Sequence, residues 1–161
     1  ALKQGIPSNS FIPSTYWRKK KPAPDADCAD PDVDRCGLIW LAPIAPMTGQ
    51  HAAILEKIIE DTLMKYGFDP AISMTLLTER CIDSVIAITY DRDRKGEEER
   101  ALTCHDELLR KLIDKGYYPY RLSTQAMGKL PQPEKGYELA ITKIKQALDP
   151  DNIFSPGRYE N

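Results

Sequence analysis

Residues 72–90, ISMTLLTERCIDSVIAITY, contain two consecutive strand patterns and decide the fold. In the first pattern, Ile72, Met74 and Leu76 alternate with small polar residues, and a period of two is typical of a half-buried strand. The second pattern, at residues 85–90, is almost continuously apolar and rich in β-branched residues, which indicates a more deeply buried strand. Because only a short link separates the two runs, we predict that these strands are partners in one sheet.

A strand and a helix are predicted upstream of this pair. Residues 37–42 form a short apolar run that ends at Pro43, which is the pattern of a buried strand. Thr48 provides an N-cap for a helix, and Gly67 ends it, since glycine tolerates the left-handed conformation that follows many helices. The apolar positions of this helix recur on one face of a 3.6-residue period: Leu55, Ile58, Ile59, Leu63 and Tyr66.

A second helix, a fourth strand and a third helix are predicted downstream. Glutamates at residues 97–99 occupy the first turn of the second helix, where negative charge complements the helix dipole, and Gly116 ends it. Residues 117–122, YYPYRL, predict an extended strand, which Pro119 confines to a strand start or a sheet edge. The third helix ends at Asp149, because a residue before proline avoids the α region. Its apolar face comprises Tyr137, Ala140, Ile141, Ile144 and Leu148.

The predicted order is strand, helix, strand, strand, helix, strand and one further helix. This is the split βαβ order of an α+β, ferredoxin-like fold, in which helices cover one face of an antiparallel sheet. Residues 1–35 lack a sustained period and are rich in turn formers. We therefore predict an extended, proline-rich arm at residues 1–35 and a ferredoxin-like domain at residues 36–161. The fold class alone identifies no function, since unrelated activities share it.

Length and charge exclude several classes of protein. The chain has 161 residues, enough for one hydrophobic core, and its 22 basic and 24 acidic residues give a net charge of −2. This balance argues against a mainly electrostatic nucleic-acid binder. No apolar run approaches the roughly 20 residues that cross a bilayer, so no membrane span is predicted. The run YWRKKK at residues 16–21 has two interpretations: it binds phosphate or a nucleic-acid strand, or it forms a solvated edge with two inward-packed aromatics. The nearly neutral charge of the whole chain favours the solvated edge.

Four cysteines are too few for a disulfide scaffold in a chain of this length. Cys28 and Cys36 leave two hypotheses open, a disulfide in an oxidising compartment or unlinked thiols, and sequence alone favours unlinked thiols. Their spacing is wider than that of zinc-binding pairs, and no metal site is predicted. Cys104 lies on the apolar stripe of its helix, which favours a packed thiol over a nucleophile. His51 and His105 are interpreted as structural histidines.

The best local constellation for chemistry comprises Tyr118, Tyr120 and Arg121. A phenol hydroxyl beside an always-charged guanidinium can bind a small anion such as a carboxylate or a phenolate. In the alternative, the tyrosines pack within the strand and Arg121 pairs with a surface acid, and composition alone favours this alternative. The sequence contains no glycine-rich phosphate loop, Ser-His-Asp set or H-E-x-x-H motif, so catalysis by this chain alone is not expected.

Three motifs resemble one enzyme family throughout: CHDELLR at 104–110, GYYPYR at 116–121 and ALDPDNIFSPGRY at 147–159. They are similar to the 4-phenol-oxidising branch of the vanillyl-alcohol oxidase flavoproteins, and YWRKK at 16–20 and APIAPMTG at 42–49 fit the same family. The D-P-x-x-I-x-x-P-G ending is shared widely among FAD-linked oxidases, whereas the Tyr-Arg pair is more specific to phenol oxidation. The resemblance covers nearly the whole chain, but only the C-terminal, substrate-cap part of such an enzyme.

The resemblance implies an FAD-dependent oxidoreductase of 4-alkylphenols whose FAD-binding domain lies outside this chain. In the family a Tyr-Arg pair binds the phenol as phenolate, so Tyr120 and Arg121 inherit a catalytic role. A phenolate favours loss of a benzylic hydride to the flavin, and water converts the resulting quinone methide into an alcohol. Arg158 matches a family arginine beside the flavin, which implies a cofactor-binding role. The isolated segment is expected to be inactive.

Two positions depart from the family pattern. Family members often carry a histidine on the strand at residues 37–42, or a tyrosine nearby, that bonds the flavin covalently. No side chain of residues 37–42 can do so, and a covalent link to FAD stays open. A family histidine near the start of the strand at Val85 is replaced by Asp83 and Ser84. Asp83 is either a substitute base or a surface aspartate, and we favour the surface aspartate.

Partners and location follow from the resemblance alone. It implies the FAD-binding domain of the same enzyme, another copy of the flavoprotein, a c-type cytochrome and a periplasmic location, without choosing cytochrome or oxygen as electron acceptor. Two other functions stay open: a free-standing ferredoxin-like module that binds a small ligand, and a protein-interaction module that uses residues 1–35 as an arm. A cap fragment differs from both because it exposes a sizeable apolar face.

Overall fold

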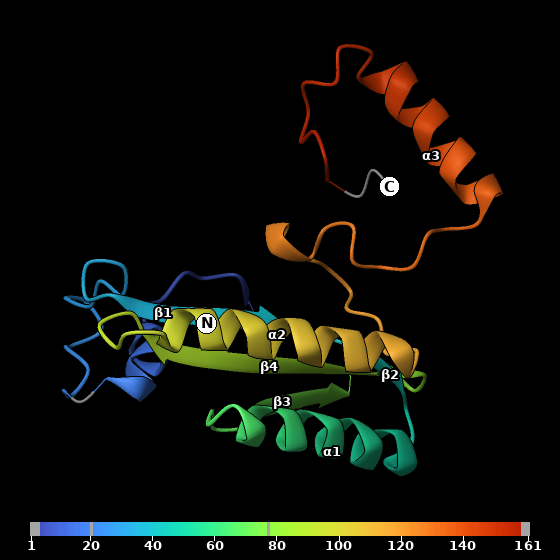
Figure 1. Cartoon of the computed structure of the whole chain (residues 1–161). Coiled ribbons are helices and arrows are strands. Elements are labelled where there is room, and N and C mark those ends of the chain that lie inside the picture. Colours follow the sequence, from blue (N-terminus) through green and yellow to red (C-terminus); the bar gives the residue numbers. More distant parts are fainter. Residues whose placement is uncertain (1–3, 20, 77, 159–161) are drawn as a thin grey trace. The chain divides into compact units, whose positions relative to one another are not determined.

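The computed structural model describes residues 4–19, 21–76 and 78–158, and its sheet is built around one long strand, β4 (Cys81–Asp91). β1 (Cys36–Leu41) pairs antiparallel with residues 86–91 of β4, and β2 (Ile44–Pro46) pairs antiparallel with residues 81–83 (Figure 1). β3 (Ala71–Leu76) pairs antiparallel with residues 82–87. Since this last stretch overlaps both of the others, β1 and β2 share one edge of β4 and β3 has the opposite edge.

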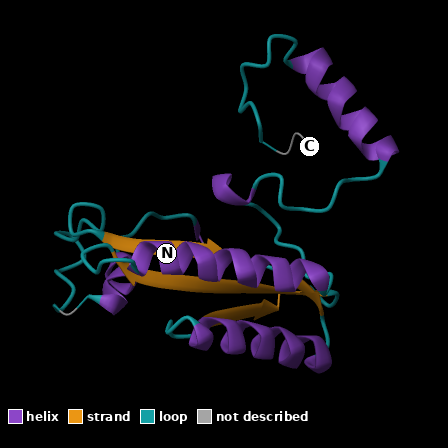
Figure 2. Ribbon diagram, viewed as in Figure 1, coloured by secondary structure: helices purple, strands orange, loops and turns teal. Residues whose placement is uncertain are grey.

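Two helices, α1 (Gly49–Lys65) and α2 (Glu97–Asp114), pack against each other and against the sheet (Figure 2). Their apolar faces meet alternate side chains of β1 and β4. Each fully buried leucine or isoleucine contributes about 1.5–3 kcal/mol relative to an exposed position. The most deeply buried of these residues are Leu55, Ile59, Leu63, Ile86, Ile88, Leu108 and Leu112. The predicted α+β class, an antiparallel sheet with helices on one face, is confirmed.

The ends of both helices lie where the sequence predicts them. The Thr48 hydroxyl accepts a hydrogen bond from the backbone N–H of His51 at 3.3 Å and so caps α1. Gly67 and Gly116 follow the ends of α1 and α2 with φ of +72° and +79°. These values lie in the left-handed region, which a glycine adopts without steric cost.

The predicted fourth strand at residues 117–122 is wrong. Within residues 117–122, the structure contains only a single β-bridge, which joins Pro119 to Pro43. Next to it, the backbone N–H of Ile44 donates to the carbonyl of Tyr118 at 2.9 Å. Two prolines that face each other supply no N–H donor, so a ladder of hydrogen bonds cannot continue there.

The sheet face that points away from α1 and α2 is only half-buried within this chain, and we call it the open face. Burial alternates along β1 and β4, and residues paired in register share a face. The open face carries Leu38 and Trp40 from β1, with Asp83, Val85 and Ala87 from β4. Trp40 is 55% exposed.

The N-terminal residues contact the sheet through a short 3-10 helix, η2 (Ile12–Arg18). Tyr16 is buried, whereas Trp17 is 70% exposed, so only one of the two aromatics packs inward. The first two basic residues that follow pair with acids of this chain. Arg18 binds Glu97, and Lys19 binds Asp91 at 2.6 Å and Asp93 at 2.9 Å. Lys20 lies outside the described residues.

The chain divides into two compact units, Ala1–Pro119 and Tyr120–Asn161. The second unit contains η3 (Thr124–Ala126) and α3 (Lys135–Leu148), and α3 ends just before Asp149 as predicted. The predicted apolar face of α3 is not buried. Large apolar side chains along the helix are exposed: Tyr137, Leu139, Ile141, Ile144 and Leu148. The domain boundary that we place at residue 36 stays a prediction.

All four cysteines are free thiols, so Cys28 and Cys36 form no disulfide. Cys104 is fully buried, and this burial raises the pKa of its thiol to about 11, which fits a packed thiol. Among the described residues, no helix has the length and apolar character needed to cross a bilayer. The same residues contain no group of three or more metal-ligating side chains placed to hold an ion.

Candidate functional site

The structure brings Tyr120 and Arg121 together in the extended segment that opens the second unit. The guanidinium carbon of Arg121 lies 5.3 Å from the centroid of the Tyr120 ring. At this distance a guanidinium is attracted to the negative face of an aromatic ring. Both side chains are exposed, Tyr120 by 51%. Tyr120 is therefore not packed inside a strand, and both polar ends remain accessible to a ligand.

Tyr118 differs from this pair because it belongs to the first unit. Its carbonyl accepts the hydrogen bond from Ile44, and its side chain is exposed. The structure thus separates the three residues of the predicted constellation into a backbone anchor, Tyr118, and a side-chain pair, Tyr120 with Arg121.

Arg158 lies in the C-terminal tail with an exposed side chain. Its backbone N–H donates to the carbonyl of Ser155 at 3.1 Å, within a turn that also contains Gly157 at a φ of +75°. No hydrogen bond, ion pair or ring contact of the described residues joins Arg158 to Tyr120 or Arg121. Its role in cofactor binding stays a prediction.

Asp149 organises the tail, a role that sequence reasoning missed. Its buried carboxylate accepts hydrogen bonds from the backbone N–H groups of Ile153 at 2.8 Å and Phe154 at 2.9 Å, and from the ammonium of Lys145. Lys145 above all, together with these two amides, holds the pKa of Asp149 below its usual range. The D-P-x-x-I spacing was the available signal, since it places amides four and five residues after the aspartate.

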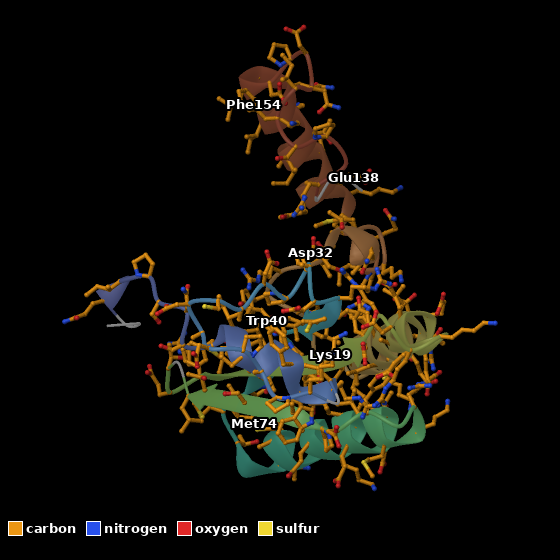
Figure 3. The ribbon with its side chains drawn as sticks, turned by 90° about the vertical axis from the view of Figure 1, so that its left-hand side faces the viewer. Lys19, Asp32, Trp40, Met74, Glu138 and Phe154 are labelled. Carbon is orange, nitrogen blue, oxygen red and sulfur yellow. The ribbon has the colours of Figure 1, made fainter. Side chains whose placement is uncertain are left out.

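The second unit also contains a groove of about 490 Å³ along α3. It is lined mainly by apolar side chains, which include Leu122, Met127, Leu130, Pro131, Tyr137 and Ile141. Figure 3 shows the side chains of this unit around α3, with Glu138 and Phe154 labelled. Phe154 is one of the exposed apolar residues of the tail.

Asp83 occupies the open face of the first unit, opposite Ile44 on β2 and Thr75 on β3. Trp40 on the same face is labelled in Figure 3. The Oδ1 atom of Asp83 is buried and has no hydrogen-bond partner within the described residues. A buried carboxylate oxygen without a donor is costly, so this side chain differs from a freely hydrated surface aspartate. Among the described residues 81–89 of β4, Asp83 is the only acidic residue, and it lies on the open face.

Two curated relatives resemble the chain in sequence, whereas no protein-family model matches it. The chain is 44% identical over 156 residues to the 1'-carboxy-chondrochloren decarboxylase of Chondromyces crocatus, which covers 97% of this chain and 28% of the relative. It is 32% identical over 123 residues to the flavoprotein subunit of 4-cresol dehydrogenase (hydroxylating) of Pseudomonas putida, which covers 76% of this chain and 23% of the relative. The chain therefore spans about a quarter of the length of these relatives.

Solved structures show the same fold. The structure of p-cresol methylhydroxylase with substrate bound matches with a TM-score of 0.70 and 31% identity, over 77% of this chain and 24% of that one. The 4-ethylphenol oxidase of Gulosibacter chungangensis, in its isoeugenol complex, matches with a TM-score of 0.69 over the same shares, and its 22% identity supports the fold alone. Sequence identity and fold together show that this chain belongs to the vanillyl-alcohol oxidase family of flavoproteins, as its cap region.

Proposed function

We propose that this chain is the substrate-cap portion of an FAD-dependent oxidoreductase that oxidises phenols with an alkyl group para to the hydroxyl. The observation that carries the proposal is the exposed pair of Tyr120 and Arg121, with the guanidinium 5.3 Å from the ring centroid. The names of a curated relative and of a solved structure, both more than 30% identical to the chain, support this substrate class, since each contains 4-cresol (p-cresol), a 4-alkylphenol.

Tyr120 and Arg121 bind the substrate as a phenolate. The guanidinium neutralises the phenolate oxygen, and the Tyr120 hydroxyl donates a hydrogen bond to the same atom. A phenolate releases electron density toward the para substituent, which favours departure of a hydride from the benzylic carbon. Because the charge on Arg121 is fixed before the reaction, it favours the ionised phenol, and this phenolate oxygen gives its negative charge to the ring as the hydride departs.

The open face offers a surface for the flat ring of FAD rather than for its diphosphate. Leu38, Trp40 and Ala87 present apolar surface there, and Asp83 is the acidic side chain that β4 adds to the same face. FAD, when bound, accepts the hydride from the benzylic carbon. Leu38, Ile39 and Trp40 have no group that bonds a flavin covalently, so β1 is proposed to hold the ring by contact. Arg158 is proposed to bind FAD through its charged guanidinium.

Hydration is the first proposed fate of the oxidised substrate. Loss of the hydride leaves a p-quinone methide, and water adds at its benzylic carbon to give a 4-hydroxybenzyl alcohol, which a second oxidation converts into the aldehyde. Asp83 is the proposed acceptor of the proton from this water. Its support is the unpartnered Oδ1 atom on the open face.

Decarboxylation is a second candidate fate, favoured by the 44% identical relative that is named a decarboxylase of a carboxylated compound. When the carbon next to the benzylic position carries a carboxylate, the quinone methide can lose carbon dioxide. The bond to the carboxylate breaks, its electron pair forms an alkene, and the ring regains aromaticity as a phenolate. No water is added. Both fates use the same phenolate, so Tyr120 and Arg121 keep their roles in each.

One experiment tests the proposed function and separates its two fates. The full-length enzyme is given 4-cresol or 3-(4-hydroxyphenyl)propanoate with an artificial electron acceptor, and products are identified by mass spectrometry. 4-Hydroxybenzyl alcohol from 4-cresol supports hydration, and 4-vinylphenol with carbon dioxide from the propanoate supports decarboxylation. Failure of both phenols to reduce the flavin contradicts the proposed function.

Proposed partners are the FAD-binding domain of the same enzyme, a second flavoprotein copy and a c-type cytochrome, and the proposed location is the periplasm. The exposed apolar side of α3, which includes Tyr137, Ile144 and Leu148, supports a covering partner over a free-standing module. Size-exclusion chromatography tests this point. The 161-residue chain is expected to self-associate when alone, whereas a monodisperse monomer supports the free-standing module.

A further inference from the structure

An imidazole–phenol pair anchors the chain just before the Tyr120–Arg121 pair. The Nδ1 atom of His51 and the hydroxyl oxygen of Tyr117 are 2.9 Å apart and share one hydrogen. Their rings meet edge to face, with centroids 5.8 Å apart and an interplanar angle of 89°. Tyr117 is only 4% exposed, so its hydroxyl depends on this partner.

Both members of the pair are fixed by helix ends. His51 lies in the first turn of α1, where its backbone N–H is bound by the Thr48 hydroxyl. Tyr117 follows Gly116 at the end of α2, and its backbone N–H donates to the carbonyl of Leu112 at 2.9 Å. Because both backbones are held, the pair couples two rigid elements rather than two loops.

Backbone contacts hold the two residues after Tyr117. The N–H of Ile44 binds the carbonyl of Tyr118, and Pro119 forms the bridge with Pro43. The ring of Pro119 also fixes its own φ. The described residues 117–122 form no ladder of backbone hydrogen bonds with a strand. The side-chain hydrogen bond between His51 and Tyr117 therefore adds a constraint on a segment that a ladder does not hold.

We propose that His51 is a positioning residue for the Tyr120–Arg121 pair and acts through Tyr117. The inference rests on the proposed function, because that function assigns the binding of a phenolate to Tyr120 and Arg121. Tyr120 is three residues from Tyr117, so the His51–Tyr117 pair fixes the end of the first unit to which Tyr120 and Arg121 are directly joined along the chain. Misplacement of binding groups by about 1 Å lowers turnover by on the order of 100-fold.

The test uses the full-length enzyme with its flavin and two matched variants, His51→Phe and Tyr117→Phe, with the double variant. His51→Phe keeps an aromatic ring but removes the nitrogen, and Tyr117→Phe removes only the hydroxyl. 4-Nitrophenol serves as an unreactive probe, because its visible absorbance reports how much is bound as phenolate. Tyr66→Phe is the control, since Tyr66 also gives its hydroxyl to a side chain, that of Glu107 at 2.7 Å, elsewhere in the fold.

We expect each single variant to weaken binding of 4-nitrophenolate about tenfold and to lower kcat for 4-cresol, and we expect the double variant to be no worse than either single one. His51→Asn, which returns a hydrogen-bonding group near Nδ1, should restore binding to within about threefold of wild type. Tyr66→Phe should leave phenolate binding unchanged.

Wild-type phenolate binding in His51→Phe, or additive losses in the double variant, overturns the positioning role even when thermal stability falls. A wild-type enzyme that neither binds 4-nitrophenolate nor oxidises 4-cresol overturns the proposed function and the positioning role together. The two failures are therefore distinguished by the behaviour of the wild-type enzyme.

Discussion

The Nε atom of Arg18 in η2 donates to the buried carboxylate of Glu97 at the start of α2, at 3.2 Å and across 79 residues of sequence. Arg94 at 3.5 Å and Arg100 at 3.8 Å reach the same carboxylate, and Glu97 as a whole residue is 1% exposed. The guanidinium groups of Arg18 and Arg100 also lie 5.4 and 5.2 Å from the centroid of the Phe68 ring. This cluster joins the N-terminal residues to the helical layer.

Glu97→Ala is expected to lower the free energy of unfolding of the 161-residue chain by about 1–3 kcal/mol, because it removes the buried carboxylate that the half-buried Arg18 and the exposed Arg94 and Arg100 share. Glu99→Ala is the matched control, since Glu99 is an exposed glutamate in the same helical turn, and it should cost about 0.5 kcal/mol or less. Urea unfolding measures both values. Equal losses in the two variants contradict the assigned role of Glu97.

Gly37→Ala is expected to destabilise the sheet by about 1–3 kcal/mol, because an added Cβ would lie 2.2 Å from the Tyr90 ring. Gly49→Ala at the start of α1 is the control, since its added Cβ meets nothing within 4 Å. It should leave stability unchanged or raise it by about 0.5–1 kcal/mol. Tyr90→Leu should recover part of the loss in Gly37→Ala, and a failure to do so places the strain elsewhere.

Glu107 should make stability depend on acid pH. Its carboxylate accepts from Lys111 at 2.9 Å, Lys65 at 2.6 Å and Tyr66 at 2.7 Å, and these partners, Lys111 first, lower its pKa to about 2. The ordinary glutamate pKa is about 4.3, so the folded state gains stability above that pH and loses it as the pH falls toward 2. The difference in urea midpoint between wild type and Glu107→Gln should be full at pH 7 and shrink through this window. A difference that is constant down to pH 2 contradicts the assignment.

Local pattern was sufficient for most of the fold. The period of two at Ile72, Met74 and Leu76 and the cap at Thr48 depend on neighbouring residues alone. The strand and the cap are both confirmed, with Ile72 and Met74 half-buried, whereas Leu76 at the end of β3 is exposed. The strand at residues 117–122 failed because its partner decides the outcome. Pro43 lies opposite Pro119, and a proline on each side removes both hydrogen-bond donors. No feature within residues 117–122 shows which residue stands across from Pro119.

The site was only partly predictable for the same reason. The pairing of Tyr120 with Arg121 follows from adjacent positions, and a motif resemblance was enough to select them. Glu97 was interpreted as a charge at a helix start, and its burial depends on Arg18, far away in the sequence. His51 was interpreted as an unremarkable histidine, because its contact with Tyr117 spans 66 residues.

Asp83→Asn should separate stability from activity. The variant replaces a charged oxygen that lacks a partner, so the thermal midpoint of the full-length enzyme should stay the same or rise. Hydration of the 4-cresol product should slow by on the order of 100-fold, since the amide accepts no proton. Asp114→Asn is the control, because Asp114 is an exposed acid paired with Arg110. Unchanged turnover in Asp83→Asn removes Asp83 from the reaction.

Flavin reduction by 4-cresol in the absence of oxygen, followed by stopped-flow absorbance in the full-length enzyme and its Arg121→Ala variant, tests the central claim most directly. The wild-type flavin should bleach, and the variant should bleach on the order of 100- to 1000-fold more slowly with the same flavin content and thermal midpoint, because Arg121 is exposed and stabilises only the bound phenolate. Equal rates in the two proteins, or a wild-type flavin that neither 4-cresol nor 3-(4-hydroxyphenyl)propanoate reduces, would contradict the account.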